Sequence, residues 1–298
     1  MSQTKNPNVL ITGATGRVGS ALVDILTTNH IPFRALSRQS AKSESLAAND
    51  YAEVIFGDLT DDAIVEKALQ GIDKAFLLTD SSATAEATQS NFVRIAAQAG
   101  LKHLVKLSQY AADINASVRF LRYHAAVEQQ IIDAGLTYTF LRPNLFMQGL
   151  LGFKEVIAEK SMFFASIGDT PVSCIDLRDI AAVAYKVLVQ GGFENQVLNL
   201  TGPEALSHAQ MAAILSDAVG RPIQFVQVTT DEMLQGLLAA GFPQWQAEGL
   251  IEDYAHYDRA EATAVYDTVQ EVTGRPAKCF KAFAVEYASL FTSTQTAH

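Results

Sequence analysis

Three glycines near the start of the chain have the spacing of a loop that binds a dinucleotide. Gly13, Gly16 and Gly19 follow an apolar strand pattern and open a helical one. The first glycine permits a tight turn, the second lets backbone N–H groups approach a pyrophosphate, and the third permits close packing of helix on strand. A glycine-rich turn without a ligand is the alternative, and the flanking strand and helix argue against it. The intervening residues that we also expect in the loop are Thr15, Arg17 and Val18.

The end of the next strand indicates which dinucleotide this loop binds. A site for NAD usually carries an acidic residue there, which holds the ribose hydroxyls. In this chain the position reads Ser37-Arg38, and the first acid is Glu44. A guanidinium pairs well with a 2′-phosphate, so Arg38, helped by Arg17 and Ser37, predicts NADP(H) as the cofactor. The alternative for Arg38 is a solvated charge at a strand end.

Other strand ends supply further candidate contacts to the cofactor. Asp58 follows the third strand, where a carboxylate can accept the adenine amino group and can also cap the next helix, two roles that are compatible. Asn144, Phe146 and Met147 follow a later strand, which we expect Pro143 to end because it lacks an N–H. All three are candidates to line the nicotinamide and substrate cleft, and the alternative for the apolar Phe146 and Met147 is the core. We assign Pro143, Asn144 and Phe146 to the cofactor site. The remaining residues that we assign to this site are Leu59, Leu78, Thr79 and Ser108.

The spacing leaves several candidates for a proton donor. A tyrosine with a lysine four residues later would form an acid–base pair, but none of the nine tyrosines has this partner, and Tyr123 is followed there by Val127. His124 can donate a proton near neutral pH, or it can pair with Glu128 on the surface of a helix. Ser108, at a strand end, can bind a substrate carbonyl or close a turn. The candidate catalytic residues are therefore Ser108, Tyr123 and His124.

These residues need a scaffold in which strands alternate with helices. The pattern predicts an α/β protein, a doubly wound parallel-sheet Rossmann fold with a smaller, mainly helical C-terminal lobe. In the first helix Val18, Leu22 and Leu26 share one apolar stripe, and the helix should end near Asn29. The expected strands are Val9–Thr12, Phe33–Ser37, Glu53–Phe56, Lys74–Leu78, His103–Leu107, Tyr138–Leu141 and Val197–Leu200.

The regular alternation weakens after Asn144, which indicates a change of domain. We assign residues 1–150 to an NAD(P)-binding Rossmann domain and residues 151–298 to a smaller substrate lobe, with about 172–202 returning to the first domain. A cleft between the lobe and the strand ends would hold the substrate. The helices expected in the lobe are Ser207–Val219, Thr230–Ala240 and Gln244–Ala255.

Composition limits the class of protein. A net charge of −10 without a local basic run argues against direct binding to nucleic acid. Cys174 and Cys279 lack CxxC spacing, which favours a reducing compartment. Asp176 and Asp179 have no accompanying histidine or third acid, so no metal site is expected. With no signal-peptide pattern and no apolar run of membrane-spanning length, we expect a cytoplasmic protein that makes no membrane contact.

Two features of the second half have structural interpretations. Arg178 and Asp179 can pair as a clamp. Trp245, the only tryptophan, can either cover a flat aromatic substrate or anchor a helix, and we favour the anchor.

Several motifs together resemble the NmrA-like, atypical members of the short-chain dehydrogenase/reductase superfamily, and the resemblance covers almost the whole chain. It implies a Rossmann domain that binds NAD(P), with a small C-terminal lobe over the nicotinamide end. Some members of this family resemble quinone, azo-dye, triphenylmethane or phenylpropanoid reductases, and others sense NADP and act as co-regulators of transcription. The motifs are Thr12–Gly16, Leu107-Ser108, Arg122–Glu128, Tyr138–Gln148, Asp176–Ala181 and Leu200–Leu206.

We therefore expect an NADPH-dependent oxidoreductase that passes hydride directly to an apolar, aromatic or quinone-like acceptor, with positioning mattering more than a dedicated acid. Because the tyrosine–lysine pair is absent, a non-catalytic NADP sensor acting through a protein partner is the alternative. A second alternative is a reductase of imines or activated double bonds in secondary metabolism. The expected binding partner is a small apolar or aromatic substrate, and the sequence leaves a homodimer or a protein partner open.

Overall fold

The computed structural model describes residues 7–292, which divide into two compact units. The first contains the described residues up to Ala116 together with Leu121–Arg142 and Ile180–Asn199. The second contains Ser117–Phe120, Pro143–Asp179 and the described residues from Leu200 onward. Among the described residues, no helix is both long enough and apolar enough to span a membrane.

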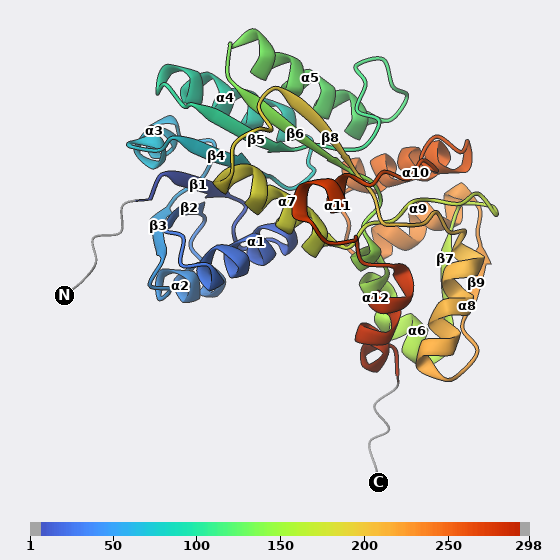
Figure 1. Cartoon of the computed structure of the whole chain (residues 1–298). Coiled ribbons are helices and arrows are strands. Elements are labelled where there is room, and N and C mark those ends of the chain that lie inside the picture. Colours follow the sequence, from blue (N-terminus) through green and yellow to red (C-terminus); the bar gives the residue numbers. More distant parts are fainter. Residues whose placement is uncertain (1–6, 293–298) are drawn as a thin grey trace. The chain divides into compact units, whose positions relative to one another are not determined.

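A seven-stranded sheet forms the centre of the first unit (Figure 1). Its strand order is β3-β2-β1-β4-β5-β6-β8, and the pairs from β3 through β6 are parallel. This order changes direction between β1 and β4, which is where a Rossmann fold binds its nucleotide. The strands are β1 (Val9–Thr12), β2 (Phe33–Ser37), β3 (Ala52–Phe56), β4 (Lys74–Leu77), β5 (His103–Leu107), β6 (Tyr138–Pro143) and β8 (Gln196–Leu200).

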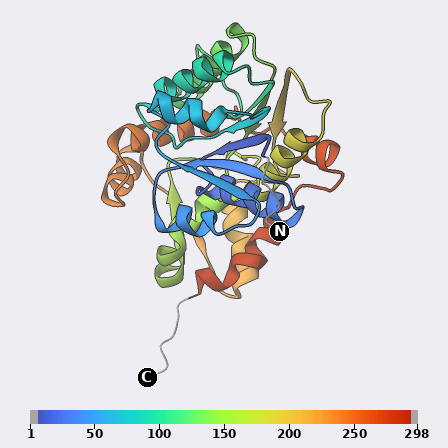
Figure 2. The same ribbon diagram turned by 90° about the vertical axis from the view of Figure 1, so that its left-hand side faces the viewer.

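Helices cover both faces of this sheet. Phe92 and Val127 pack with Leu104 in a buried apolar cluster on the face covered by α3, α4 and α5. The ammonium of Lys74 donates to the carbonyl of Leu188 at 2.8 Å and so connects β4 to α7 on the other face. Figure 2 shows α4 and α5 (teal and green) above the strands and α1 (blue) below them. The helices are α1 (Arg17–Thr28), α2 (Ala41–Ala47), α3 (Asp62–Leu69), α4 (Ala85–Gln98), α5 (Arg119–Asp133) and α7 (Leu177–Val189).

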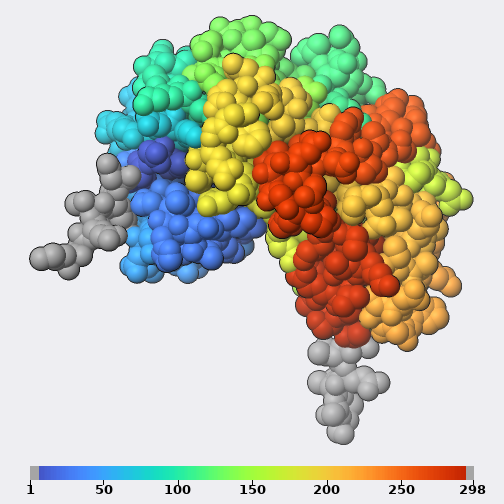
Figure 3. Space-filling view, viewed as in Figure 1, coloured from blue at the N-terminus to red at the C-terminus, as the bar shows by residue number. Residues whose placement is uncertain are grey.

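The second unit combines helices with a small parallel sheet of two strands, β7 and β9. Helix α12 packs along α8, and the two lie side by side in red and gold in Figure 3. The strands are β7 (Met162–Ala165) and β9 (Gln224–Gln227). The helices are α6 (Lys154–Lys160), α8 (His208–Val219), α9 (Thr230–Ala239), α10 (Gln244–Asp258), α11 (Thr268–Thr273) and α12 (Phe280–Tyr287), with the 3₁₀ helices η1 (Met147–Phe153) and η2 (Ala288–Phe291).

The α/β fold predicted from the sequence is confirmed. All seven expected strands of the large sheet are present within two residues of their predicted ends, and the three expected helices of the lobe correspond to α8, α9 and α10. Strands β7 and β9 were not predicted. Each has only four residues, and the burial of β9 does not alternate, so period-two patterning gives no signal there.

Candidate functional site

A cavity of about 570 Å³ lies at the carboxyl ends of β1, β2, β3 and β4. This volume is in the range of sites that hold small molecules and cofactors. The residues lining it that were assigned to the cofactor from the sequence are Gly13, Thr15, Gly16, Ser37, Arg38, Asp58, Leu59, Leu78 and Thr79.

The glycine loop needs its glycines for steric reasons. Gly13 has a φ of +61°, and a Cβ at this position would lie 2.8 Å from the carbonyl oxygen of Leu78. A Cβ on Gly19 would lie 2.1 Å from the carbonyl oxygen of Gly13, far inside contact distance. Gly16 caps the N-terminus of α1 and donates its N–H to the carbonyl of Gly13 at 3.0 Å. The loop therefore turns tightly while α1 packs directly against it.

Arg38 stands exposed in the cavity wall with an unengaged guanidinium. Within the described residues, the side-chain hydrogen bonds to Arg38 involve only its backbone carbonyl, which accepts from the hydroxyls of Ser37 and Ser43. Because the Arg38 guanidinium forms no ion pair within residues 7–292, its donors are available for an anionic ligand.

Asp58 presents a carboxylate to the same cavity. Its Oδ1 accepts hydrogen bonds from the backbone N–H of Thr60 at 2.9 Å and the hydroxyl of Thr60 at 2.8 Å. These bonds, with a smaller contribution from the charge of Arg38, hold the pKa of Asp58 below its ordinary value. The capping role expected of Asp58 is wrong, because Asp61 caps α3.

One side of the cavity was not predicted. It is formed by the loop after β4 and the first turn of α4, where Thr79-Asp80-Ser81-Ser82-Ala83-Thr84 follows a strand end. This run of polar residues after a strand was the signal in the sequence that could have predicted this side of the cavity. The lining residues that sequence reasoning missed are Leu36, Gly57, Thr60, Asp80, Ser82, Thr84, Ala85 and Thr88.

Other residues assigned to the cofactor do not line this cavity. Arg17, Val18 and Gly19 form the first turn of α1, and Val18 and Gly19 are buried. Ser108 is also buried and outside the cavity wall. The positions Pro143, Asn144 and Phe146 belong to the second unit.

Asn144 has a structural role within the second unit. Its side-chain amide donates to the Ser173 hydroxyl at 2.8 Å and to the carbonyl of Ala262 at 2.9 Å. Its own Oδ1 accepts from the backbone N–H of Leu145 at 2.9 Å. Met147 is 2% exposed, which agrees with the interpretation that it belongs to the core.

The three candidate catalytic residues lie directly after β5 (Ser108) and on α5 (Tyr123 and His124) in the first unit. The hydroxyl of Ser108 donates to Oε1 of Glu128 at 2.5 Å. Tyr123 has its hydroxyl 3.1 Å from that of Ser81, and its ring centroid lies 4.1 Å from that of His124. Because Ser81 stands between Asp80 and Ser82, which line the cavity, Tyr123 adjoins the cavity wall.

The predicted surface pair between His124 and Glu128 is wrong. Both side chains are buried, and each has another partner. Glu128 forms an ion pair with Arg142, whereas His124 Nδ1 lies 2.6 Å from the ammonium nitrogen of Lys106. Lys106 was missed, although a lysine within an otherwise buried strand was a visible anomaly.

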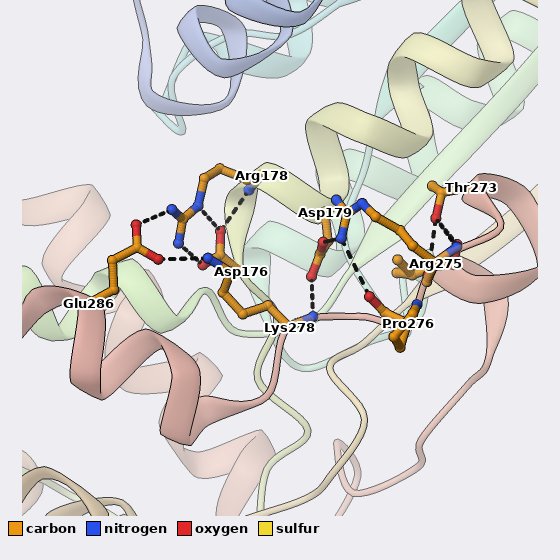
Figure 4. A network of polar contacts seen from close by, with 9 residues as sticks. Asp176, Arg178, Asp179, Thr273, Arg275, Pro276, Lys278 and Glu286 are labelled. Carbon is orange, nitrogen blue, oxygen red and sulfur yellow. Dashed lines mark hydrogen bonds and ion pairs between the residues drawn. The ribbon is translucent and has the colours of Figure 1, made fainter. Parts of the chain in front are cut away.

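The acidic and basic residues around the start of α7 form a network within the second unit (Figure 4). Arg178 pairs with Asp176 and Glu286, and Asp179 pairs with Arg275, so the expected Arg178–Asp179 clamp is wrong. Asp179 also accepts the backbone N–H of Lys278 at 2.7 Å. The network thereby joins α7 to the segment that carries α11 and α12.

Trp245 takes the anchoring role. Its ring lies 5.3 Å from that of Phe120, and the guanidinium of Arg119 lies 5.6 Å from its centre. Arg119 also forms ion pairs with Glu248 and Glu252, which fixes α10 to the first residues of α5.

Comparison with known proteins gives matches over nearly the whole chain. The model of the NmrA-like family matches residues 5–287. An NAD(P)H azoreductase from Xenophilus azovorans is 38% identical over 283 residues, which cover 95% of this chain and 99% of that protein. An NADPH-dependent quinone oxidoreductase from Escherichia coli, solved with NADPH, superposes with a TM-score of 0.85 at 26% identity, covering 94% and 99% of the two chains. A triphenylmethane reductase from Citrobacter, solved with NADP(H), gives a TM-score of 0.84 at 25% identity over the same shares.

Proposed function

Because the chain belongs to the NmrA-like family, we propose that it is an NADPH-dependent oxidoreductase that transfers hydride to an apolar, aromatic or quinone-like acceptor. The observation that carries the proposal is the cavity at the ends of β1–β4, with the unengaged Arg38 in its wall. The named relatives reduce azo, quinone and triphenylmethane compounds, a group that includes aromatic dyes and quinones.

The residues that line the cavity have the chemical groups, and the positions, that binding of NADP(H) requires. The N-terminus of α1, with no acidic residue in its first turn, would receive the pyrophosphate against the glycine loop. Arg38 would pair with the 2′-phosphate, and the ionised Asp58 would accept the adenine amino group. When bound, the cofactor supplies the hydride.

The expected site of action is the cytoplasm. The two cysteines support this part of the proposal because both are free thiols, as is usual in a reducing compartment. A homodimer and a protein partner remain predictions.

Calorimetric titration with NADPH and with NADH tests the cofactor assignment. We expect the wild-type protein to bind NADPH at least tenfold more tightly, and Arg38→Ala to abolish that preference by weakening NADPH alone, since a charged hydrogen bond contributes about 1.5–3 kcal/mol. Arg94→Ala is the matched control, because Arg94 is an exposed arginine that lies outside the cavity wall.

Oxidation of NADPH, followed at 340 nm in the presence of menadione, methyl red or malachite green, then tests turnover. Tight binding of NADPH without oxidation by any of these acceptors would overturn the enzymatic assignment in favour of a sensor. Binding of neither nucleotide would overturn the cofactor assignment itself.

A further inference from the structure

Lys106 is a lysine buried completely within the central sheet. Its side chain is 0% exposed, on β5 between Val105 and Leu107. Burying an ammonium group has a large free-energy cost unless partners compensate it. Its hydrogen-bond partners are His124 Nδ1 at 2.6 Å and the carbonyl of Leu107 at 3.2 Å.

The carboxylate whose charge acts on Lys106, that of Glu128, is already engaged by other groups. Oε1 of Glu128 accepts from Ser108 at 2.5 Å and from Nε of Arg142 at 3.0 Å, and Oε2 pairs with the same guanidinium. The charges that act on Lys106 are therefore the carboxylate of Glu128 on α5 and the guanidinium of Arg142 on β6, which oppose each other. The direct partner of Lys106 is an imidazole.

These surroundings destabilise the protonated form of Lys106. Burial, only partly opposed by Glu128, lowers the pKa of Lys106 to about 7. Burial, together with the charges of Lys106 and Arg142, lowers the pKa of His124 well below its ordinary value. Near neutral pH Lys106 is therefore close to half protonated, and the imidazole of His124 beside it is neutral.

Tyr123 links this pair to the loop that lines the cofactor cavity. The His124 ring lies beside the Tyr123 ring and is tilted by 32° from it. The Tyr123 hydroxyl lies 3.1 Å from the hydroxyl of Ser81 in that loop. An imidazole can take a proton at one nitrogen while it releases one from the other. Lys106 lies on the Nδ1 side, so Nε2 is the nitrogen left for an acceptor.

We propose that His124 and Lys106 form a proton store, in which His124 protonates the acceptor and Lys106 is the positioning residue that restores the lost proton. The inference rests on the proposed function and extends it to acceptors that need a proton together with the hydride, of which the azo group is the model. The N=N π bond breaks as hydride binds one nitrogen and the Nε2 proton binds the other, which gives a hydrazine and NADP⁺. The proton of Lys106 moves to Nδ1. When solvent then supplies a proton to Nε2, the Nδ1 proton returns to the Lys106 amine and the pair is restored.

Two dyes separate proton delivery from hydride transfer. Methyl red needs a hydride and a proton, whereas the cation malachite green becomes its neutral leuco form by taking hydride alone. A defect in the proton store should therefore affect methyl red and spare malachite green. A defect in folding or in cofactor binding should affect both.

The test compares Lys106→Met and His124→Gln with wild type on both dyes. The glutamine can still accept the hydrogen bond of Lys106, but its amide cannot pass on a proton. We expect kcat for methyl red to fall at least tenfold in both variants, within the usual contribution of proton transfer, while kcat for malachite green stays within threefold. Lys74→Met is the matched control, because Lys74 lies on the neighbouring strand and bonds to the Leu188 carbonyl, and it should leave both rates unchanged.

The pH profile gives a second readout. Since the protonated form of Lys106 is needed, wild-type kcat for methyl red should decrease as pH rises through about 7, and this decrease should be absent in Lys106→Met. Equal losses on both dyes, an unchanged rate with methyl red, or a wild-type enzyme that reduces malachite green only would overturn the proton store and leave the proposed function standing. A wild-type protein that reduces neither dye nor menadione would overturn both.

Discussion

The hydroxyl of Thr12 joins the ends of two strands by bonding twice to the backbone of Leu78. It accepts the N–H of Leu78 at 2.8 Å and lies 2.9 Å from the carbonyl oxygen of the same residue. Thr12 is 0% exposed, so both backbone groups would lose a partner in Thr12→Val. We expect a destabilisation of about 1–3 kcal/mol in urea unfolding, together with weaker binding of NADPH because Leu78 lines the cavity.

An exposed threonine provides the control for this change. Thr230, the first residue of α9, should tolerate valine with a change within about 0.5 kcal/mol. Equal stability of Thr12→Val and wild type would show that the connection between β1 and β4 does not depend on this hydroxyl.

Gly19→Ala tests the close approach of α1 to the glycine loop. The added methyl group would lie 2.1 Å from the carbonyl oxygen of Gly13, and neither backbone can move without displacing the loop. We expect NADPH affinity to fall at least tenfold in calorimetry. In contrast, Gly149→Ala places its methyl group in open space and should bind NADPH as wild type does. Full NADPH affinity in Gly19→Ala would contradict the assignment of the loop.

The features predicted well from the sequence are those that local patterns encode. Parallel buried strands, the first helix and the glycine spacing follow from periodicity and position, and Arg38 follows from its place at the end of β2. The partners of Lys106 and Glu128 could not be predicted, because they depend on which faces of β5, β6 and α5 meet. Helical spacing suggested a His124–Glu128 pair, but tertiary contacts supply each residue with another partner.

Long-range ion pairs are hidden from the sequence for the same reason. Arg178 lies 108 residues before Glu286, and nothing local distinguishes Glu286 from its neighbours as a partner. The adjacent Asp179 seemed the natural partner, but successive residues at the start of a helix point in different directions. Arg178 therefore turns to Asp176, and Asp179 turns to Arg275.

The two carboxylates that bind Arg178 should contribute unequally to stability. Asp176 is 0% exposed and accepts from the Arg178 backbone at 2.9 Å and from its Nε at 2.8 Å, whereas Glu286 is 42% exposed. Removing one partner of a buried pair costs about 3–5 kcal/mol, and removing an exposed one costs under about 1 kcal/mol. We expect Asp176→Asn to lower the free energy of unfolding by about 3 kcal/mol and Glu286→Gln by less than 1 kcal/mol.

At low pH, the difference in the free energy of unfolding between Asp176→Asn and Glu286→Gln should become smaller. Burial raises the pKa of Asp176, but hydrogen bonds from Arg178 outweigh it, so the pKa lies below its ordinary value. The stability that the ionised Asp176 contributes is therefore fully present above the ordinary carboxyl pKa. It is lost as pH falls through the lowered pKa of Asp176 in the folded protein. Urea unfolding at several pH values should show the free energy of unfolding of Asp176→Asn approaching that of wild type below pH 4. Equal losses in Asp176→Asn and Glu286→Gln at pH 7 would contradict the asymmetry.

His208 should make the second unit sensitive to acid. It is 3% exposed among the rings of Phe163, Phe225 and Tyr254, and burial lowers its pKa to about 4. The unfolded chain takes up this proton near pH 6.5, so stability rises with pH between about 4 and 6.5 and is lost on acidification. A pKa of about 4 in place of 6.5 corresponds to about 3 kcal/mol.

His208→Phe removes this titration while keeping an aromatic ring in the cluster. We expect the variant to lose about 3 kcal/mol less stability than wild type between pH 7 and pH 4, as measured by urea unfolding at several pH values. His30→Asn is the control, because His30 is exposed and asparagine tolerates its positive φ of 57°. A pH dependence of stability in His208→Phe as steep as that of wild type would assign the acid sensitivity to other groups, of which the buried His124 is the first to test.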